Sequence, residues 1–144
     1  MGYVTDIRRA ALENEDFRRV LYTTERTQLV LMSVRPGDDI GLETHDLDQV
    51  LGFVGGTGYS LLNGKRAPIG PGTGVVVPAG TEHNFVNTGS EPLKHYTLYA
   101  PPAHPDGTVH RTKAEAEAAE AAEHGHGERK SGHSFTVGSL RRGG

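Results

Sequence analysis

Glycine, proline and asparagine recur at short intervals between residues 36 and 107, and this spacing constrains the fold more than any other feature of the sequence. The chain has 20 glycines and 8 prolines among 144 residues. The segments between them are short and rich in Val, Leu, Ile, Phe and Tyr, which is typical of strands. They are RRVLYT at 18–23, QLVLMSV at 28–34, and then IGLETH, QVLGFVG, YSLLNG, GVVVPAG, HNFVNTG and LKHYTLYAP. About eight or nine short strands without intervening helices predict an all-β antiparallel barrel or sandwich.

Two local signals support this interpretation. The stretch LLNGKRAPI predicts a hairpin, because Asn63-Gly64 suits a type I′ turn. Pro78 stands at the end of GVVVP, where a strand stops rather than in the middle of a hydrogen-bonded ladder.

The two ends of the chain differ in composition from the strand region. Residues 5–16 predict a short N-terminal helix or an irregular arm. Residues 112–124 are rich in Ala and Glu and predict a helix, with Thr112 as N-cap and Glu115 three positions later. This helix has no apolar residue larger than Ala, so we expect it to bury little. We therefore divide the chain into a barrel domain at 1–112, a helical and flexible linker at 113–133, and a terminal peptide at 134–144.

Composition and charge exclude several classes of function. A formal net charge of −3 does not favour nucleic-acid binding. Cysteine is absent, which removes disulfides and thiolate chemistry. No apolar run predicts a signal peptide or a membrane span, so we expect a soluble cytoplasmic protein without membrane contacts. No phosphate loop, serine nucleophile elbow or carboxylate dyad is recognisable. A metal is then the only visible centre for chemistry.

Four residues form the candidate metal site. Glu43 and His45 lie two apart in a predicted strand and therefore share one face of the sheet. Gln49 follows at the start of the next strand, and His83 comes just after the Pro78-Ala79-Gly80 turn. Two imidazoles, one carboxylate and one amide oxygen suit a divalent Fe, Mn, Zn, Ni or Co ion.

The spacing of these residues resembles that of a known family. The run Gly37-x5-Glu43-x-His45-x3-Gln49-x6-Gly56 is similar to the first motif of the cupin superfamily. The run Gly72-x5-Pro78-x-Gly80-x2-His83-x3-Asn87 is similar to the second motif at every named position. The resemblance implies a jelly-roll β-barrel that holds one metal ion in its mouth.

Two ligand positions depart from the common cupin pattern. Position 43 carries Glu where the family usually has His, and position 49 carries Gln where it usually has Glu. The one carboxylate of the ligand set is thus at position 43 instead of position 49, so the set keeps its negative charge. A Gln carbonyl is the weaker ligand, and Gln49 either binds the metal or supports the ligands from behind.

A second resemblance lies at the C-terminus. The sequence FTVGSLRR is similar to the targeting peptide of encapsulin cargo proteins, whose recurring core is Leu-Thr-Val-Gly-Ser-Leu followed by basic residues. The resemblance implies docking on the inner wall of an encapsulin shell through Phe135, Val137 and Leu140, with Gly138 at a bend and Thr136 and Ser139 completing the peptide. It also implies residence inside an encapsulin nanocompartment in the cytoplasm.

These features together predict a metal-dependent enzyme of an oxidoreductase or dioxygenase-like type that acts on a small molecule. A non-catalytic module that binds a metal or small ligand is the alternative. A sugar-phosphate isomerase ranks below both, because Lys65, Arg66 and Lys94 are dispersed and form no phosphate site. The resemblance to cupins also implies a homodimer.

Three further histidines have open roles. His104 either closes over the barrel mouth as a proton donor or lies in a surface loop together with His110. His95 alternates with Leu93 and Thr97, so we expect it to face inward as a core residue.

Overall fold

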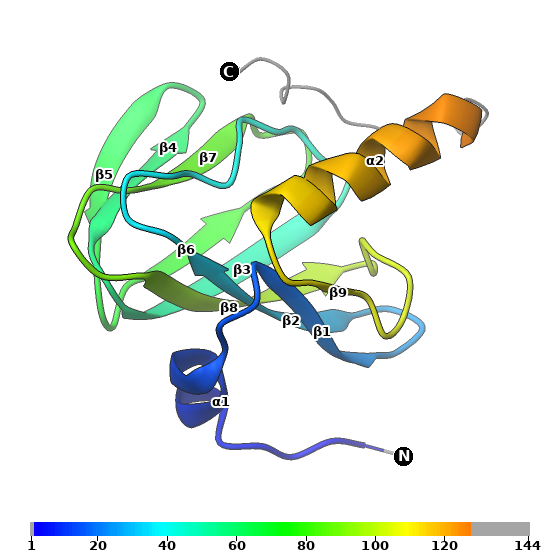
Figure 1. Cartoon of the computed structure of the whole chain (residues 1–144), viewed down its shortest axis with the longest axis horizontal. Helices are drawn as coiled ribbons and strands as arrows, with labels where there is room; N and C mark the ends of the chain where they lie inside the picture. Colours follow the sequence, from blue (N-terminus) through cyan, green and yellow to red (C-terminus); the bar gives the residue numbers. More distant parts are fainter. Residues whose placement is uncertain (1, 128–144) are drawn as a thin grey trace.

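The computed structural model describes residues 2–127, and two antiparallel sheets form its body (Figure 1). The larger sheet has six strands in the order β6-β3-β8-β2-β1-β9, and the smaller has three in the order β5-β4-β7. The strands are β1 Arg18–Thr23, β2 Gln28–Val34, β3 Asp48–Gly55, β4 Gly58–Leu62, β5 Lys65–Ile69, β6 Gly74–Val77, β7 His83–Asn87, β8 Leu93–Ala100 and β9 Val109–His110. The predicted all-β jelly-roll fold is confirmed.

The core lies between the two sheets and follows from the alternation of side chains along each strand. In β8 the buried positions are Leu93, His95, Thr97 and Tyr99, whereas the residues between them are partly or fully exposed. Phe53 of β3 and Phe85 of β7 bring the two sheets into contact, with ring centroids 5.6 Å apart. The inward face is therefore mostly apolar, with polar side chains at defined levels.

The predicted hairpin forms between β4 and β5. Its turn residues Asn63 and Gly64 have φ values of 50° and 82°, and a type I′ turn requires positive φ at both positions. Pro78 directly follows the last residue of β6, as expected for a residue that cannot donate to a ladder.

The segment IGLETH does not form the strand that its sequence predicts. It contributes only one isolated bridge to β7, between Glu43 and His83, and Asp39, just before the segment, forms another with Val86. Gly41 interrupts the extended chain with a φ of 114°, and its N–H donates to the side-chain oxygen of Asn84 at 2.9 Å instead of to a ladder partner. Glu43 is nevertheless held by two backbone hydrogen bonds to His83, each of 2.9 Å.

Two helices flank the sheets. The short helix α1 (Ile7–Glu13) is capped by Asp6, whose carboxylate accepts a hydrogen bond from the N–H of Arg9 at 3.1 Å. It packs on β2, β3 and β8 of the larger sheet. This helix confirms one of the two predictions for residues 5–16.

The second helix, α2 (Lys113–Gly127), packs against the barrel (Figure 1). The hydroxyl of Thr112 accepts from the N–H of Glu115 at 3.1 Å, so the predicted cap is present. Ala116 is only 2% exposed within the core, and Lys113 forms ion pairs with Asp38 and Asp39. Between residues 2 and 127, no helix is long and apolar enough to cross a membrane.

Candidate metal centre

Three of the four predicted site residues come together at the end of the barrel. Glu43, His45 and His83 each offer one donor atom, and these atoms all lie within 4.8 Å of one another. Glu43 and His83 are neighbours because their backbones pair directly. His45 joins them because it lies two residues further along the extended segment that begins at Glu43.

The ring of His83 is held in an orientation that leaves one nitrogen available. Its Nδ1 donates a hydrogen bond to the backbone carbonyl of Thr81 at 2.8 Å, since a carbonyl oxygen can only accept. The proton is then on Nδ1, and Nε2 carries a lone pair. Burial lowers the pKa of His83 despite this hydrogen bond, so the imidazole is neutral near pH 7, as a metal ligand must be.

Glu43 is the anionic member of the site. Burial alone raises the pKa of its carboxyl group, but the hydrogen bond from His45 and the charges of His45, Arg18 and His83 outweigh that effect and lower the pKa. The His45 Nε2 to Glu43 Oε1 distance is 3.0 Å. The carboxylate is thus ionised at neutral pH and is in contact with one of the two imidazoles.

Gln49 lies on the inward face of β3, and Tyr99 links it to this group. It pairs with Tyr99 of β8, and the Tyr99 ring packs edge-on to His45 with centroids 6.3 Å apart. The side chain is buried, and its Oε1 has no hydrogen-bond partner among the described residues. A buried amide oxygen without a donor is costly, and a bound cation or an ordered water would satisfy it. The donor set and this oxygen therefore fit a divalent metal.

A chain of ring contacts links the site to the loop at 101–108 through Tyr99 of β8. The ring of His104 packs edge-on to that of Tyr99 with centroids 5.4 Å apart, and its Nε2 is buried without a partner in the described chain. Burial, followed by the charges of Arg18, His45 and His110, lowers the pKa of His104 well below its usual value. Its backbone is fixed by Gln28, which bonds to both the N–H and the carbonyl of His104. His104 is thus a neutral, partly buried ring near the site.

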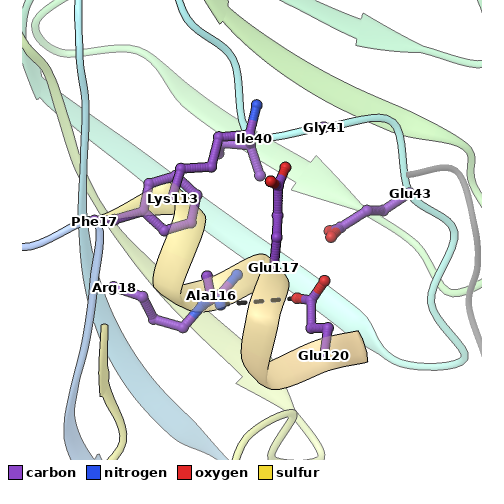
Figure 2. Close-up of a pocket in the computed structure, with 9 residues that line it drawn as sticks. All are labelled: Phe17, Arg18, Ile40, Gly41, Glu43, Lys113, Ala116, Glu117 and Glu120. Carbon is purple, nitrogen blue, oxygen red and sulfur yellow. Dashed lines mark ion pairs between the residues drawn. The ribbon is translucent and has the colours of Figure 1, made fainter. Parts of the chain in front are cut away.

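A pocket next to Glu43 contains charged residues that sequence reasoning did not identify. Figure 2 shows Arg18 of β1 with Glu117 and Glu120 of α2 lining the same pocket as Glu43. One signal was available in the sequence: the alternation of RRVLYT places Arg18 on the same inward face as Val20. The contribution of α2 had no such signal, because nothing local indicates where that helix packs.

Other predicted residues lie elsewhere. His95 faces inward as expected, but neither of its ring nitrogens has a partner in the described chain. Lys65 and Arg66 lie on β5, where Arg66 stacks on Tyr59, and Lys94 Nζ bonds to the carbonyl of Asn14 beyond α1. None of these three lines the pocket beside Glu43. The docking residues Phe135–Leu140 lie outside the described residues.

The fold and the site define the class of protein, and the chain belongs to the cupin family. A cupin domain model matches residues 30–99, which extend from β2 to β8. The uncharacterized protein YrkC of Bacillus subtilis is 46% identical over 125 residues, which cover 82% of this chain and 67% of that protein.

Solved structures agree with this assignment. The crystal structure of BH2720 from Bacillus halodurans has a TM-score of 0.80 and 43% identity, and the match covers 82% of this chain and 95% of that one. A predicted oxalate decarboxylase from Thermotoga maritima has a TM-score of 0.51 and 25% identity, with 54% of this chain and 69% of that one covered. Cupins commonly bind a metal, and the grouping of Glu43, His45 and His83 is consistent with that property.

Proposed function

We propose that this cupin is a metal-dependent enzyme, of an oxidoreductase or dioxygenase-like type, that acts on a small molecule inside an encapsulin nanocompartment. The observation that carries the enzymatic part is the convergence of Glu43, His45 and His83, whose donor atoms lie within 4.8 Å of one another, beside a pocket that shares Glu43. The similarity to a predicted oxalate decarboxylase supports an enzyme of small-molecule metabolism.

The protein's own residues have distinct roles in this proposal. His83 offers Nε2 because Thr81 fixes its Nδ1 proton, and Glu43 supplies the anionic oxygen. Gln49 contributes either as a fourth ligand or as a support behind the others. A bound divalent ion would supply Lewis-acid or redox chemistry at a coordination position left open for the substrate. Fe, Mn, Zn, Ni and Co are all compatible with this donor set.

A non-catalytic binding module is the second candidate. Its support is that Arg18, Glu117 and Glu120 line the pocket beside Glu43, and such groups can bind a polar ligand without reacting with it. Turnover in a screen of small organic acids with Fe(II) or Mn(II) would support the enzyme, whereas saturable binding without turnover would support the module.

Metal content tests the site directly. Purified protein is expected to hold about one divalent ion per chain by elemental analysis, and His45→Ala with His83→Ala should remove it. The matched control replaces His124, His126 and His133, which the sequence places far from the cupin motifs, and it should retain the ion. Metal that stays with the first variant and leaves the second would overturn the assignment.

The encapsulin part of the proposal rests on the sequence FTVGSLRR at 135–142. Its apolar residues follow a polar stretch, and a segment of that kind is suited to ordering on a partner. Deleting residues 134–144 should abolish co-purification with a co-expressed encapsulin shell while leaving metal content unchanged. A variant with the same eleven residues scrambled is the control for length and composition. Loading that survives the deletion or the scrambling would contradict the proposal.

A further inference from the structure

Arg18 is a buried cation whose hydrogen bonding is incomplete. It faces inward from β1, and its side chain is only 4% exposed. Its Nη1 donates to Nδ1 of His110 at 3.2 Å, but its Nε has no partner among the described residues. Burying a charge without full pairing is costly. The guanidinium also points Nη1 toward Glu120, so it is suited to binding an additional acceptor on that side.

The position of Arg18 places that binding capacity next to the metal centre. Arg18 and Glu43 line the same pocket (Figure 2). The charge of Arg18 is also one of the influences that lower the pKa of Glu43, as expected for groups at short range. A ligand in this pocket therefore lies between the guanidinium and Glu43, which is the member of the metal site that lines the pocket.

The carboxylate of Glu120 already stands in front of Arg18. The Glu120 Oε2 to Arg18 Nη1 distance is 3.8 Å, which is an ion pair but is too long for a hydrogen bond. Glu120 is 41% exposed and belongs to α2. This ion pair is long, and its carboxylate lies at the surface. A ligand carboxylate that forms two hydrogen bonds with the guanidinium could therefore displace it.

We propose that Arg18 is the binding residue for a carboxylate group of the small-molecule ligand, and that Glu120 occupies this position until the ligand arrives. The ligand class is therefore a small carboxylic acid with a second donor group directed at the metal. This inference deepens the proposed function and rests on it for the role of the metal, although binding at Arg18 does not require a metal.

The charged side chains of the pocket favour binding of an anion only if Glu120 moves away from Arg18. Lys113 also lines the pocket, but its ammonium group is neutralised by Asp38 and Asp39. Glu43 would be offset by a bound cation. Arg18 then remains as the cation for the ligand, and Glu120 is its competitor. Glu117 lines the same pocket without an ion pair to Arg18.

Titration calorimetry with malonate, at fixed ionic strength and with metal-free and Mn(II)-loaded protein, tests this inference. Malonate should bind to both forms, and less tightly to the metal-free form, in which no cation offsets the charge of Glu43. The uncharged analogue malonamide should bind to neither. Arg18→Lys should weaken malonate binding by about tenfold or more, because an ammonium group cannot donate the paired hydrogen bonds of a guanidinium. Its metal content should stay at the wild-type level.

The helix variants give the sharper comparison, and they still decide the question if Arg18→Lys does not fold. Glu120→Gln should tighten malonate binding by about two- to fivefold, because the competing carboxylate is lost and the long ion pair that it forms is a weak one. Glu117→Gln makes the same change of charge in the same pocket and should have a smaller effect. Equal effects of these two variants, wild-type affinity in Arg18→Lys, or no malonate binding by the wild type would each overturn the inference. Protein that takes up no metal but shows the expected Glu120 dependence would refute the proposed enzyme and leave the Arg18 site supported.

Discussion

At the scale of single residues, His95 is a titratable side chain in the core of the barrel. It is fully buried, with its ring 4.8 Å from that of Phe53 and 6.4 Å from that of Phe85. Both ring nitrogens lack partners among the described residues. Burial lowers its pKa from the ordinary value of 6.5 to about 3. His95 is therefore a neutral core residue under all but acidic conditions.

This shift predicts a specific loss of stability in acid. Between about pH 3 and 6.5 the unfolded chain binds a proton at His95 and the folded chain does not. The free energy of unfolding therefore falls as pH decreases through this range, with a slope of up to about 1.4 kcal/mol per pH unit from this residue. His95→Leu should reduce the slope in urea unfolding of the metal-free protein.

A neighbouring residue supplies the control. The hydroxyl of Thr97 is also buried without a partner in the described chain, but it does not titrate. Thr97→Val should leave the pH slope unchanged. If the free energies of unfolding of His95→Leu and of the wild type change equally with pH, the environment assigned to His95 is wrong.

At the scale of elements, the contact between β4 and β7 depends on a glycine. A Cβ atom at Gly58 would lie 1.9 Å from the backbone carbonyl oxygen of Val86, and a backbone atom cannot move without separating the two strands. Gly58→Ala should therefore lower the free energy of unfolding by about 3 kcal/mol, at the upper end of typical overpacking costs. Urea denaturation measures the change.

Gly74 of β6 is the matched position. A Cβ atom there would meet its nearest neighbour, the carbonyl oxygen of Leu51, at 3.8 Å, which is ordinary contact. Gly74→Ala should stabilise the protein by roughly 0.5–1 kcal/mol, because alanine has fewer unfolded conformations to lose. Similar effects of the two substitutions would contradict the close approach of β4 and β7.

The strands themselves could largely be predicted from the sequence, since their signals are local. RRVLYT and QLVLMSV coincide with β1 and β2, and the Asn63-Gly64 turn forms between β4 and β5. The prediction failed for IGLETH, where Gly41 and the side chain of Asn84 replace ladder pairing. The hydrogen bond that replaces ladder pairing is accepted by Asn84, 43 residues away in the sequence. The local sequence of IGLETH therefore could not predict it.

For the candidate site, too, local motifs could be predicted from the sequence, whereas contacts between distant segments could not. Motif spacing indicated Glu43, His45 and His83, and the structure brings these three together. Arg18 and Glu120 were not identified, because they meet only where α2 packs on the barrel. The sequence of α2 suggested little burial, yet Ala116 reaches the core. A helix that packs through alanine has no periodic pattern of large apolar residues, so the contact of α2 with the core could not be predicted from its sequence.

At the scale of the whole molecule, the outer face of the larger sheet is unequally covered. At one end α1 packs on it, with Leu12 beside Gly55 and Lys94 bonded to the residue after the helix. Towards the other end, three apolar side chains on adjacent strands stay exposed: Val76 at 63%, Val50 at 42% and Leu98 at 39%. Val50 pairs directly with both of the others. A contiguous apolar patch of this kind is typical of an interface.

This patch leads us to propose that the protein forms a homodimer through the β6-β3-β8 face. Val76→Lys should convert the dimer to a monomer in sedimentation velocity, because a buried ammonium at a self-paired interface has no counter-charge and occurs twice by symmetry. Val109→Lys makes the same change at a 40% exposed valine on β9, the opposite edge of the sheet, and should leave the dimer intact. A monomeric wild type, or equal dissociation in both variants, would exclude this interface. Metal content should be the same in both variants, since neither valine lies at the Glu43 site.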